Sequence, residues 1–302
     1  MQMSYLTRLG VTISVLITSC FISVVPVSAQ SDAADDAKRR INLAGRQRMF
    51  SQRMSKAACF ILTGVEVEKH EKMLQKTYDL FAVTNDALSN GSDTLELKPE
   101  RNPPVFVALT RVQKRWDDFA PKVRAVIDRS TIDTGTLAEL DASGLVLLKD
   151  MNTAVNFIAR TYGDQLPDLP LILAVTIDLA GRQRMFTQKM SKDFCLIDAG
   201  VEPDANRADL EATAQYFTAT LDALIDGFPG AVMAAPNDDI LAKLLEVKGL
   251  WKEPAAVLLA TASGEPISEA DRLLIADQME KVLVTMNEAV KLYEFVDGTE
   301  NQ

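Results

Sequence analysis

Apolar residues recur along this chain at the three- and four-residue spacing of amphipathic helices, in eight segments separated by glycine, proline, asparagine and serine. The first four segments cover residues 34–62, 66–89, 105–129 and 136–162, and the last four cover 171–198, 203–226, 238–262 and 268–296. Amphipathic helices joined by short connections pack most simply as antiparallel bundles. The pattern therefore predicts an all-α protein made of two tandem antiparallel four-helix bundles.

The two halves of the chain repeat each other. Residues 41–56 (INLAGRQRMFSQRMSK) recur almost unchanged as residues 177–192 (IDLAGRQRMFTQKMSK). Weaker matches continue at nearly the same offset, since Trp116 aligns with Trp251 and residues 151–152 align with 286–287. A repeat this long indicates a whole domain present twice. We place the copies at residues 35–165 and 171–297, with residues 166–170 as the linker.

Composition supports a helical globular protein and limits its partners. The 302 residues are 47% hydrophobic and 25% charged, and the formal net charge is −10. An anionic molecule repels nucleic acid and anionic lipid, so neither is an expected partner. Beyond the N-terminal segment no apolar run approaches the length of a bilayer span, so the mature chain is not expected to cross a membrane.

The N-terminus is similar to a secretory signal. Arg8 precedes an apolar run over residues 11–25, and small residues follow up to Ala29. We expect residues 1–29 to be a signal peptide cleaved after Ala29, which gives a periplasmic protein. The alternative is a lipoprotein anchored at Cys20, because residues 17–20 (ITSC) resemble a lipobox. The apolar residues that follow Cys20 disfavour this alternative.

The duplicated phrase carries the candidate chemistry. A glycine inside a helix costs about 1 kcal/mol relative to alanine, so Gly45 and Gly181 indicate a close approach of two helices. The arginine one turn later, Arg48 or Arg184, would be partly desolvated in that contact and would need an anion. The candidate ligand-binding residues are Gly45, Arg46, Arg48 and Gln52 in the first copy, and Gly181, Arg182, Arg184 and Gln188 in the second.

Arginine suits a small oxyanion because its guanidinium presents several donors in a fixed fork. If the first helices of the two bundles lie side by side, Arg48 and Arg184 converge on one anion, and release of that anion lets the helices move. The phrase would then form a local cationic surface on an acidic protein. In the alternative interpretation, the arginines form a solvated face paired with acidic neighbours such as Asp35 and Asp36.

Two cysteines remain after the predicted cleavage, and they occupy equivalent places in the two copies. Cys59 lies on the same helical face as Arg48, and Cys195 lies on the same face as Arg184. Two readings stay open: two separate buried thiols, or one disulfide between the copies in an oxidising compartment.

Catalysis finds little support in the sequence. The single histidine, His70, is replaced in the second copy by Asn206, and neither a histidine pair nor a phosphate loop is present. We therefore expect no enzyme activity, no metal site and no cofactor, and we expect His70 to be a solvated helix residue. The methionines of the phrase, Met49, Met54, Met185 and Met190, are expected to fill the core.

Residues 41–54 resemble the opening helix of the NarX-like domain, the periplasmic sensor module of nitrate- and nitrite-sensing histidine kinases, which also occurs in PilJ-type transducers of type IV pilus chemotaxis. The resemblance covers both halves and implies a four-helix sensor bundle in each. It also implies that Arg48 and Arg184, three positions after the motif glycine, hold an anion at a dimer interface that the tandem copies imitate. The pairs at residues 46–47 and 182–183 look like the pilus-transducer variant.

These observations predict a periplasmic sensor-type binding protein for a small oxyanion, with nitrate or nitrite as the first candidate. Because the chain ends at Gln302 without a signalling module, we expect it to pass the bound state to a membrane receptor or pilus-system protein. The alternative is a structural or interaction module whose glycine-arginine face docks a helix of a pilus, chemoreceptor or envelope protein, with no small ligand. Self-association through the same face is a third reading.

Overall fold

The protein is described by a computed structural model that covers residues 27–165 and 169–296. The described residues form eight α-helices and no strand longer than an isolated bridge, so the all-α prediction is confirmed. In chain order the helices are α1 (Val27–Leu62), α2 (Val67–Asn90), α3 (Pro103–Arg129), α4 (Thr134–Gln165), α5 (Leu171–Asp198), α6 (Pro203–Asp226), α7 (Asp238–Ala262) and α8 (Glu269–Tyr293).

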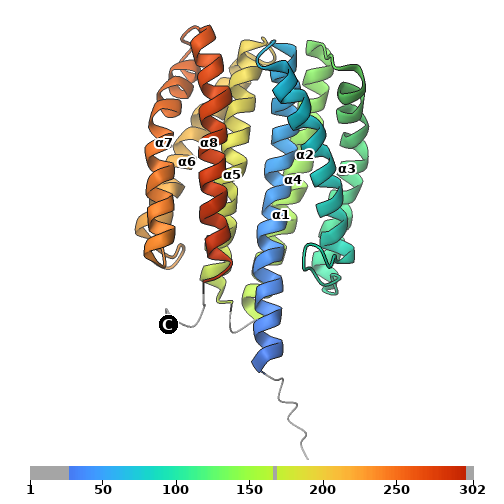
Figure 1. Cartoon of the computed structure of the whole chain (residues 1–302), viewed down its shortest axis with the longest axis vertical. Helices are drawn as coiled ribbons and strands as arrows, with labels where there is room; N and C mark the ends of the chain where they lie inside the picture. The colour runs from blue at the N-terminus through green and yellow to red at the C-terminus, as the bar shows by residue number, and fades with distance from the viewer. Residues whose placement is uncertain (1–26, 166–168, 297–302) are drawn as a thin grey trace, which may run out of the picture.

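The helices form two four-helix bundles that lie side by side with their axes aligned (Figure 1). Within the first copy, α1 and α3 each pack against both α2 and α4, and in the second copy α5 and α7 relate in the same way to α6 and α8. Consecutive helices run in opposite directions, so α1 and α5 are parallel and begin at the same end of the molecule (Figure 1). Equivalent residues of the two copies can therefore meet at one level.

Turn chemistry sets the helix ends close to the predicted positions. Gly91 ends α2 with φ of 83°, and a Cβ there would lie 2.7 Å from the backbone nitrogen of Pro99, so only glycine fits. Asn102 and Asn237 cap α3 and α7 through their side-chain oxygens, and Ser268 forms a capping box with Asp271 at the start of α8.

The largest boundary difference is at the start of α1, which begins at Val27 rather than at residue 34. The predicted cleavage point after Ala29 falls in its first turn. Most of the predicted signal peptide, including Cys20 of the lipoprotein alternative, lies outside the described residues, as do residues 166–168 of the predicted linker. No described helix is both long and apolar enough to span a bilayer.

The two bundles are joined along their first helices. The most extensive helix contact in the molecule is between α1 and α5, and α5 also packs against α4. This central position buries most of the duplicated phrase, including Arg48 and Lys56, and leaves a few of its residues, such as Arg46, partly exposed. The expectation of a local cationic surface is therefore wrong, because the helices that carry the phrase form the interface between the copies.

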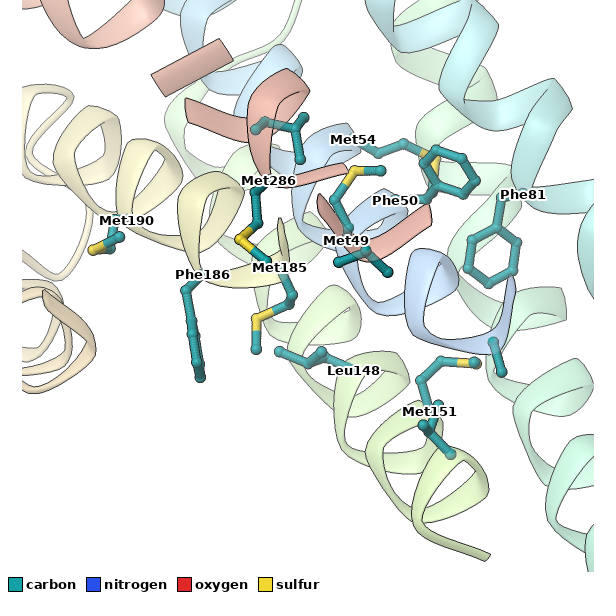
Figure 2. Close-up of a cluster of buried hydrophobic side chains, with 14 of the residues drawn as sticks. Met49, Phe50, Met54, Phe81, Leu148, Met151, Met185, Phe186, Met190 and Met286 are labelled. Carbon is teal, nitrogen blue, oxygen red and sulfur yellow. The ribbon is translucent and has the colours of Figure 1, made fainter. Parts of the chain in front are cut away.

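Sulfur-rich apolar side chains fill the centre of the molecule. Met49 from α1, Met185 from α5 and Met286 from α8 gather with Leu148 from α4 where the two bundles meet (Figure 2). The four methionines of the duplicated phrase are all buried, so their predicted role as core residues is confirmed. Flexible thioether side chains suit this irregular space beside the arginines.

Candidate functional site between the two copies

The backbones of the two copies approach each other closely at their motif glycines. A Cβ built on Gly45 would lie 3.9 Å from the Cα of Gly181, and 3.3 Å from the Nη2 atoms of both Arg48 and Arg184. A Cβ on Gly181 would meet the same two guanidiniums, at 3.3 and 3.5 Å. The structure thus brings together the two arginines that the repeat singles out. We call this contact of α1 with α5 the arginine seam.

Arg48 is neutralised across the seam by the other copy. Its Nη1 lies 2.7 Å from Oδ1 of Asp178, and its Nη2 donates to the backbone oxygen of Asp178 at 3.2 Å. A weaker hydrogen bond, of 3.4 Å, runs from Nη1 to Oδ1 of Asn152. Arg48 is fully buried, and burial lowers the pKa of its guanidinium while the charge of Asp178 raises it.

Arg184 is equally buried but has only neutral hydrogen-bond acceptors among the described residues. Its Nη1 donates to Oδ1 of Asn287 at 2.9 Å, and its Nη2 donates to the backbone oxygen of Asn42 at 3.1 Å. Burial is the main reason that the pKa of Arg184 falls well below its usual value. The charges of Arg46 and Arg48 lower it further, and Glu294 offsets them only in part.

The difference between the two arginines comes from one position of the repeat. Asn42 and Asp178 are equivalent, because both precede their motif glycine by three residues. The asparagine partners are equivalent too, since Asn152 on α4 and Asn287 on α8 align in the repeat. The seam is therefore nearly symmetric in shape and asymmetric in charge.

Two more guanidiniums lie beside the seam. Arg182 pairs with Oδ2 of Asp178 at 2.9 Å and donates to Oδ1 of Asn156 at 2.9 Å. Its counterpart Arg46 lies over the ring of Phe50, with Cζ 5.4 Å from the ring centroid, and makes no ion pair with the described residues. Arg46 is only partly buried, and its charge acts on Arg184.

The predicted glutamines lie one turn further along the helices. Gln52 and Gln188 are fully buried, and each Nε2 donates to the hydroxyl of the preceding residue at 3.3 Å. Neither amide makes a hydrogen bond with Arg48 or Arg184 within the described chain. Their Oε1 atoms are buried without a hydrogen-bond donor from the described residues.

Further contacts fix the copies to each other beyond the glutamines. Cys59 and Cys195 are joined by a disulfide, with their Cα atoms 6.1 Å apart. Buried Lys56 pairs with Glu280 of the second copy, and buried Lys192 pairs with Asp141 of the first copy at 2.6 Å. Each phrase therefore places a lysine in the other bundle, and these pairs oppose separation of the copies at this end of the seam.

His70 is buried, so the expectation of a solvated residue is wrong. Its ring stacks on Phe60 with centroids 4.8 Å apart, and its Nδ1 lies 2.9 Å from the backbone oxygen of Val65. Asn206 donates to the equivalent oxygen, that of Val201, at 2.8 Å. Both side chains thus close the turn before the second helix of their copy. Within the described residues no cluster of three acidic, histidine or cysteine side chains could hold a metal ion.

Three of the alternative readings fail against this geometry. The solvated-face alternative is wrong for Arg48 and Arg184, because both are fully buried and Asp35 and Asp36 pair instead with Lys38 and Arg40. The glycine-arginine face also cannot dock a foreign helix or a second molecule in this state. Its place is taken by the chain's own second copy.

Sequence reasoning missed the groups that complete the seam. The difference between Asn42 and Asp178 was visible in the aligned phrases, and it decides which arginine has a counter-ion. The repeated asparagines at 152 and 287 were also visible as part of the repeat. Asn152 and Asn287 are polar residues at equivalent positions on the apolar faces of their helices. This was the signal that could have identified them as partners of the arginines.

A comparison with protein families assigns the chain. The family model described as type IV pili methyl-accepting chemotaxis transducer N-term matches residues 29–140 and again residues 173–282. No curated protein and no solved structure shows significant similarity to the chain. The match is to the pilus-transducer family, whose members are non-enzymatic sensory domains, and the likeness to NarX stays a prediction. Because the two matches cover most of its length, the chain belongs to the family of type IV pilus methyl-accepting chemotaxis transducer N-terminal domains, of which it carries two copies.

Proposed function

We propose that the protein is a periplasmic sensory domain that binds a small oxyanion in the arginine seam and passes the bound state to a membrane receptor or pilus-system protein. Nitrate and nitrite are the first candidates. The family assignment supports the sensory role, and the geometry of the seam supports the anion.

One observation carries this proposal: Arg184 is buried without a carboxylate partner among the described residues. Four guanidiniums, of Arg46, Arg48, Arg182 and Arg184, lie in or beside the seam, whereas the carboxylates that act on them are those of Asp178 and Glu294. An uncompensated buried charge costs on the order of 3–5 kcal/mol. An anion that reached Arg184 would remove that cost.

The seam also offers a way to report binding. The disulfide lies eleven residues beyond Arg48 on α1, or about 16 Å along the helix at 1.5 Å per residue. The disulfide holds α1 and α5 together at its own end of the seam. Repulsion between guanidiniums that lack a counter-ion can therefore separate the two helices only at the opposite end. Loss of the anion is then expected to separate the N-terminal ends of α1 and α5, and this is the movement that a docked partner would sense.

Isothermal titration calorimetry with nitrate, nitrite, sulfate and phosphate tests the proposal. We expect saturable binding of nitrate or nitrite that Arg184→Gln abolishes while far-UV circular dichroism stays helical. Arg124→Gln is the matched control, because Arg124 forms an exposed pair with Asp128 on α3, and its binding is expected to be unchanged. A wild-type protein that binds none of the four anions contradicts the proposal.

A further inference from the structure

We infer that Asp178 is a built-in counter-ion that permanently fills the Arg48 half of the seam, so that each chain exchanges a single anion, on the Arg184 half, and selects a planar monoanion. The part concerning Arg184 rests on the function proposed above. The role of Asp178 does not, because it is carried by the asymmetry between Asn42 and Asp178.

The counter-ion role follows from where the carboxylate lies. Oδ1 of Asp178 approaches Nη1 of Arg48 at 2.7 Å, and Oδ2 approaches Nη2 of Arg182 at 2.9 Å. The residue is only 6% exposed, and its backbone oxygen also accepts from Arg48. A tethered carboxylate competes with free anions at a high effective concentration, so a dissolved anion cannot displace it.

The opposite half has the same frame without the carboxylate. Asn42 replaces Asp178, and its Nδ2 donates to Oε1 of Glu294, so this carboxylate is held by a neutral amide. The backbone oxygen of Asn42 accepts from Arg184, which forms no ion pair with the described residues. The pKa of Arg184 falls further than that of Arg48, where the carboxylate is in place. The charge that Asp178 supplies to Arg48 is therefore the charge that Arg184 lacks.

The equivalence of the Arg48 and Arg184 halves also indicates the shape and charge of the anion that would bind beside Arg184. Across from Arg48 the protein places a planar carboxylate with one negative charge, and Arg184 keeps the equivalent asparagine partner, Asn287 in place of Asn152. Planar monoanions such as nitrate, nitrite, bicarbonate or acetate match this template. Sulfate and phosphate dianions are tetrahedral, and the desolvation cost of an ion grows with the square of its charge, which disfavours them in a buried site.

Substitutions at positions 178 and 42 test the inference. The measured quantity is the number of nitrate ions bound per chain, obtained by calorimetry, and sulfate serves as the tetrahedral anion for comparison. Wild type is expected to bind one nitrate per chain. Asp178→Asn removes the carboxylate from the Arg48 half and is expected to bind two. The double variant Asn42→Asp, Glu294→Gln supplies the missing carboxylate and keeps a donor beside it, so it is expected to bind none. Arg48→Gln with Asp178→Asn removes charge and counter-charge together, and it is expected to bind one, as wild type does.

Each outcome decides something different. If wild type and Asp178→Asn each bind one nitrate per chain, the counter-ion role is overturned and the proposed function is left intact. If wild type binds no nitrate but Asp178→Asn binds one, the counter-ion role is supported and the proposed function is overturned. If neither protein binds nitrate, both are overturned. Sulfate binding as tight as nitrate binding in wild type overturns the monoanion selectivity.

Stability gives a second readout if Asp178→Asn folds poorly without anion. The thermal midpoint of this variant is expected to lie below that of wild type and to rise more steeply with nitrate concentration, because two ligands then stabilise the folded state. An equal dependence on nitrate in the two proteins overturns the inference.

Discussion

The Cα of Gly181 lies 3.9 Å from the position that a Cβ on Gly45 would take, and the terminal nitrogens of Arg48 and Arg184 lie at 3.3 Å from that same position. The two copies of the domain therefore meet where neither helix has a side chain, and the space that this leaves is filled by two buried guanidiniums. Small residues in the repeat thus create the room for charge at the centre of the molecule.

Gly45→Ala is expected to lower the free energy of unfolding by roughly 1 kcal/mol. Alanine gains about 1 kcal/mol from helix propensity, but its methyl group must displace two guanidiniums that are already fixed by hydrogen bonds, and such overpacking costs about 1–3 kcal/mol. Urea denaturation measures the difference. Gly249→Ala on α7 is the matched control, because nothing lies within 4 Å of its added Cβ, and it is expected to stabilise the protein by about 0.5–1 kcal/mol. Equal stabilisation by both changes would show that the methyl group at position 45 fits without displacing the guanidiniums, which would contradict the prediction.

His70 is expected to make the protein less stable as the pH falls from about 6.5 to about 4. Burial, and then the charge of Lys56, lower the pKa of His70 to about 4, so the unfolded chain binds this proton at a higher pH than the folded chain does. The loss amounts to roughly 2–3 kcal/mol, since one pKa unit corresponds to about 1.4 kcal/mol.

His70→Asn isolates that contribution, because Asn206 already makes the equivalent hydrogen bonds in the second copy. Urea denaturation of both proteins at pH 7 and pH 4.5 provides the comparison. The variant should lose less stability on acidification than wild type. Identical losses would rule out His70 as the source.

Glu280→Gln is expected to destabilise the protein by about 3–5 kcal/mol, because it leaves the buried Lys56 without a counter-charge. Burial would raise the pKa of Glu280, but the charges of Lys56 and Arg53 outweigh it and lower that pKa to about 2. Asp277→Asn serves as the control on the same helix, since Asp277 and Lys281 form an exposed pair that contributes at most about 1 kcal/mol. Similar thermal midpoints for the two variants would speak against a structural role for the Lys56 pair.

Replacement of both Cys59 and Cys195 by alanine is expected to cost about 2–4 kcal/mol, because the disulfide closes a long loop between the two copies. Alkylation in denaturant, applied to a chain that starts at Gln30, checks the pairing itself. Without reductant no label is expected, and after reduction two labels are expected. Two labels without reductant would contradict the disulfide.

Local sequence patterns were sufficient to predict the fold. Apolar periodicity and turn residues located the eight helices within a few residues, apart from the start of α1, because both signals act over one or two turns of chain. The duplicated phrase was equally visible. Gly45 and Gly181 correctly indicated a close approach of the helices, since a glycine inside a helix needs a reason.

The partners of the phrase could not be predicted in the same way. Periodicity tells which residues share a face, but it does not tell which distant helix covers that face. Lys56 meets Glu280, which lies 224 residues away, and Arg48 meets Asp178, which lies 130 residues away. The phrase therefore looked like an exposed cationic face, although α1 and α5 bury it between the two bundles.

The most direct test of the central claim is a nuclear magnetic resonance titration of the arginine side-chain Nε–H signals with nitrate. The Nε of Arg184 is buried and lacks a protein acceptor among the described residues, and its signal can be assigned by its loss in Arg184→Lys. We predict a saturable shift of this signal, with the exposed Arg124 unaffected. If nitrate leaves the Arg184 signal unchanged, or shifts all arginine signals together without saturation, the seam is not an anion site.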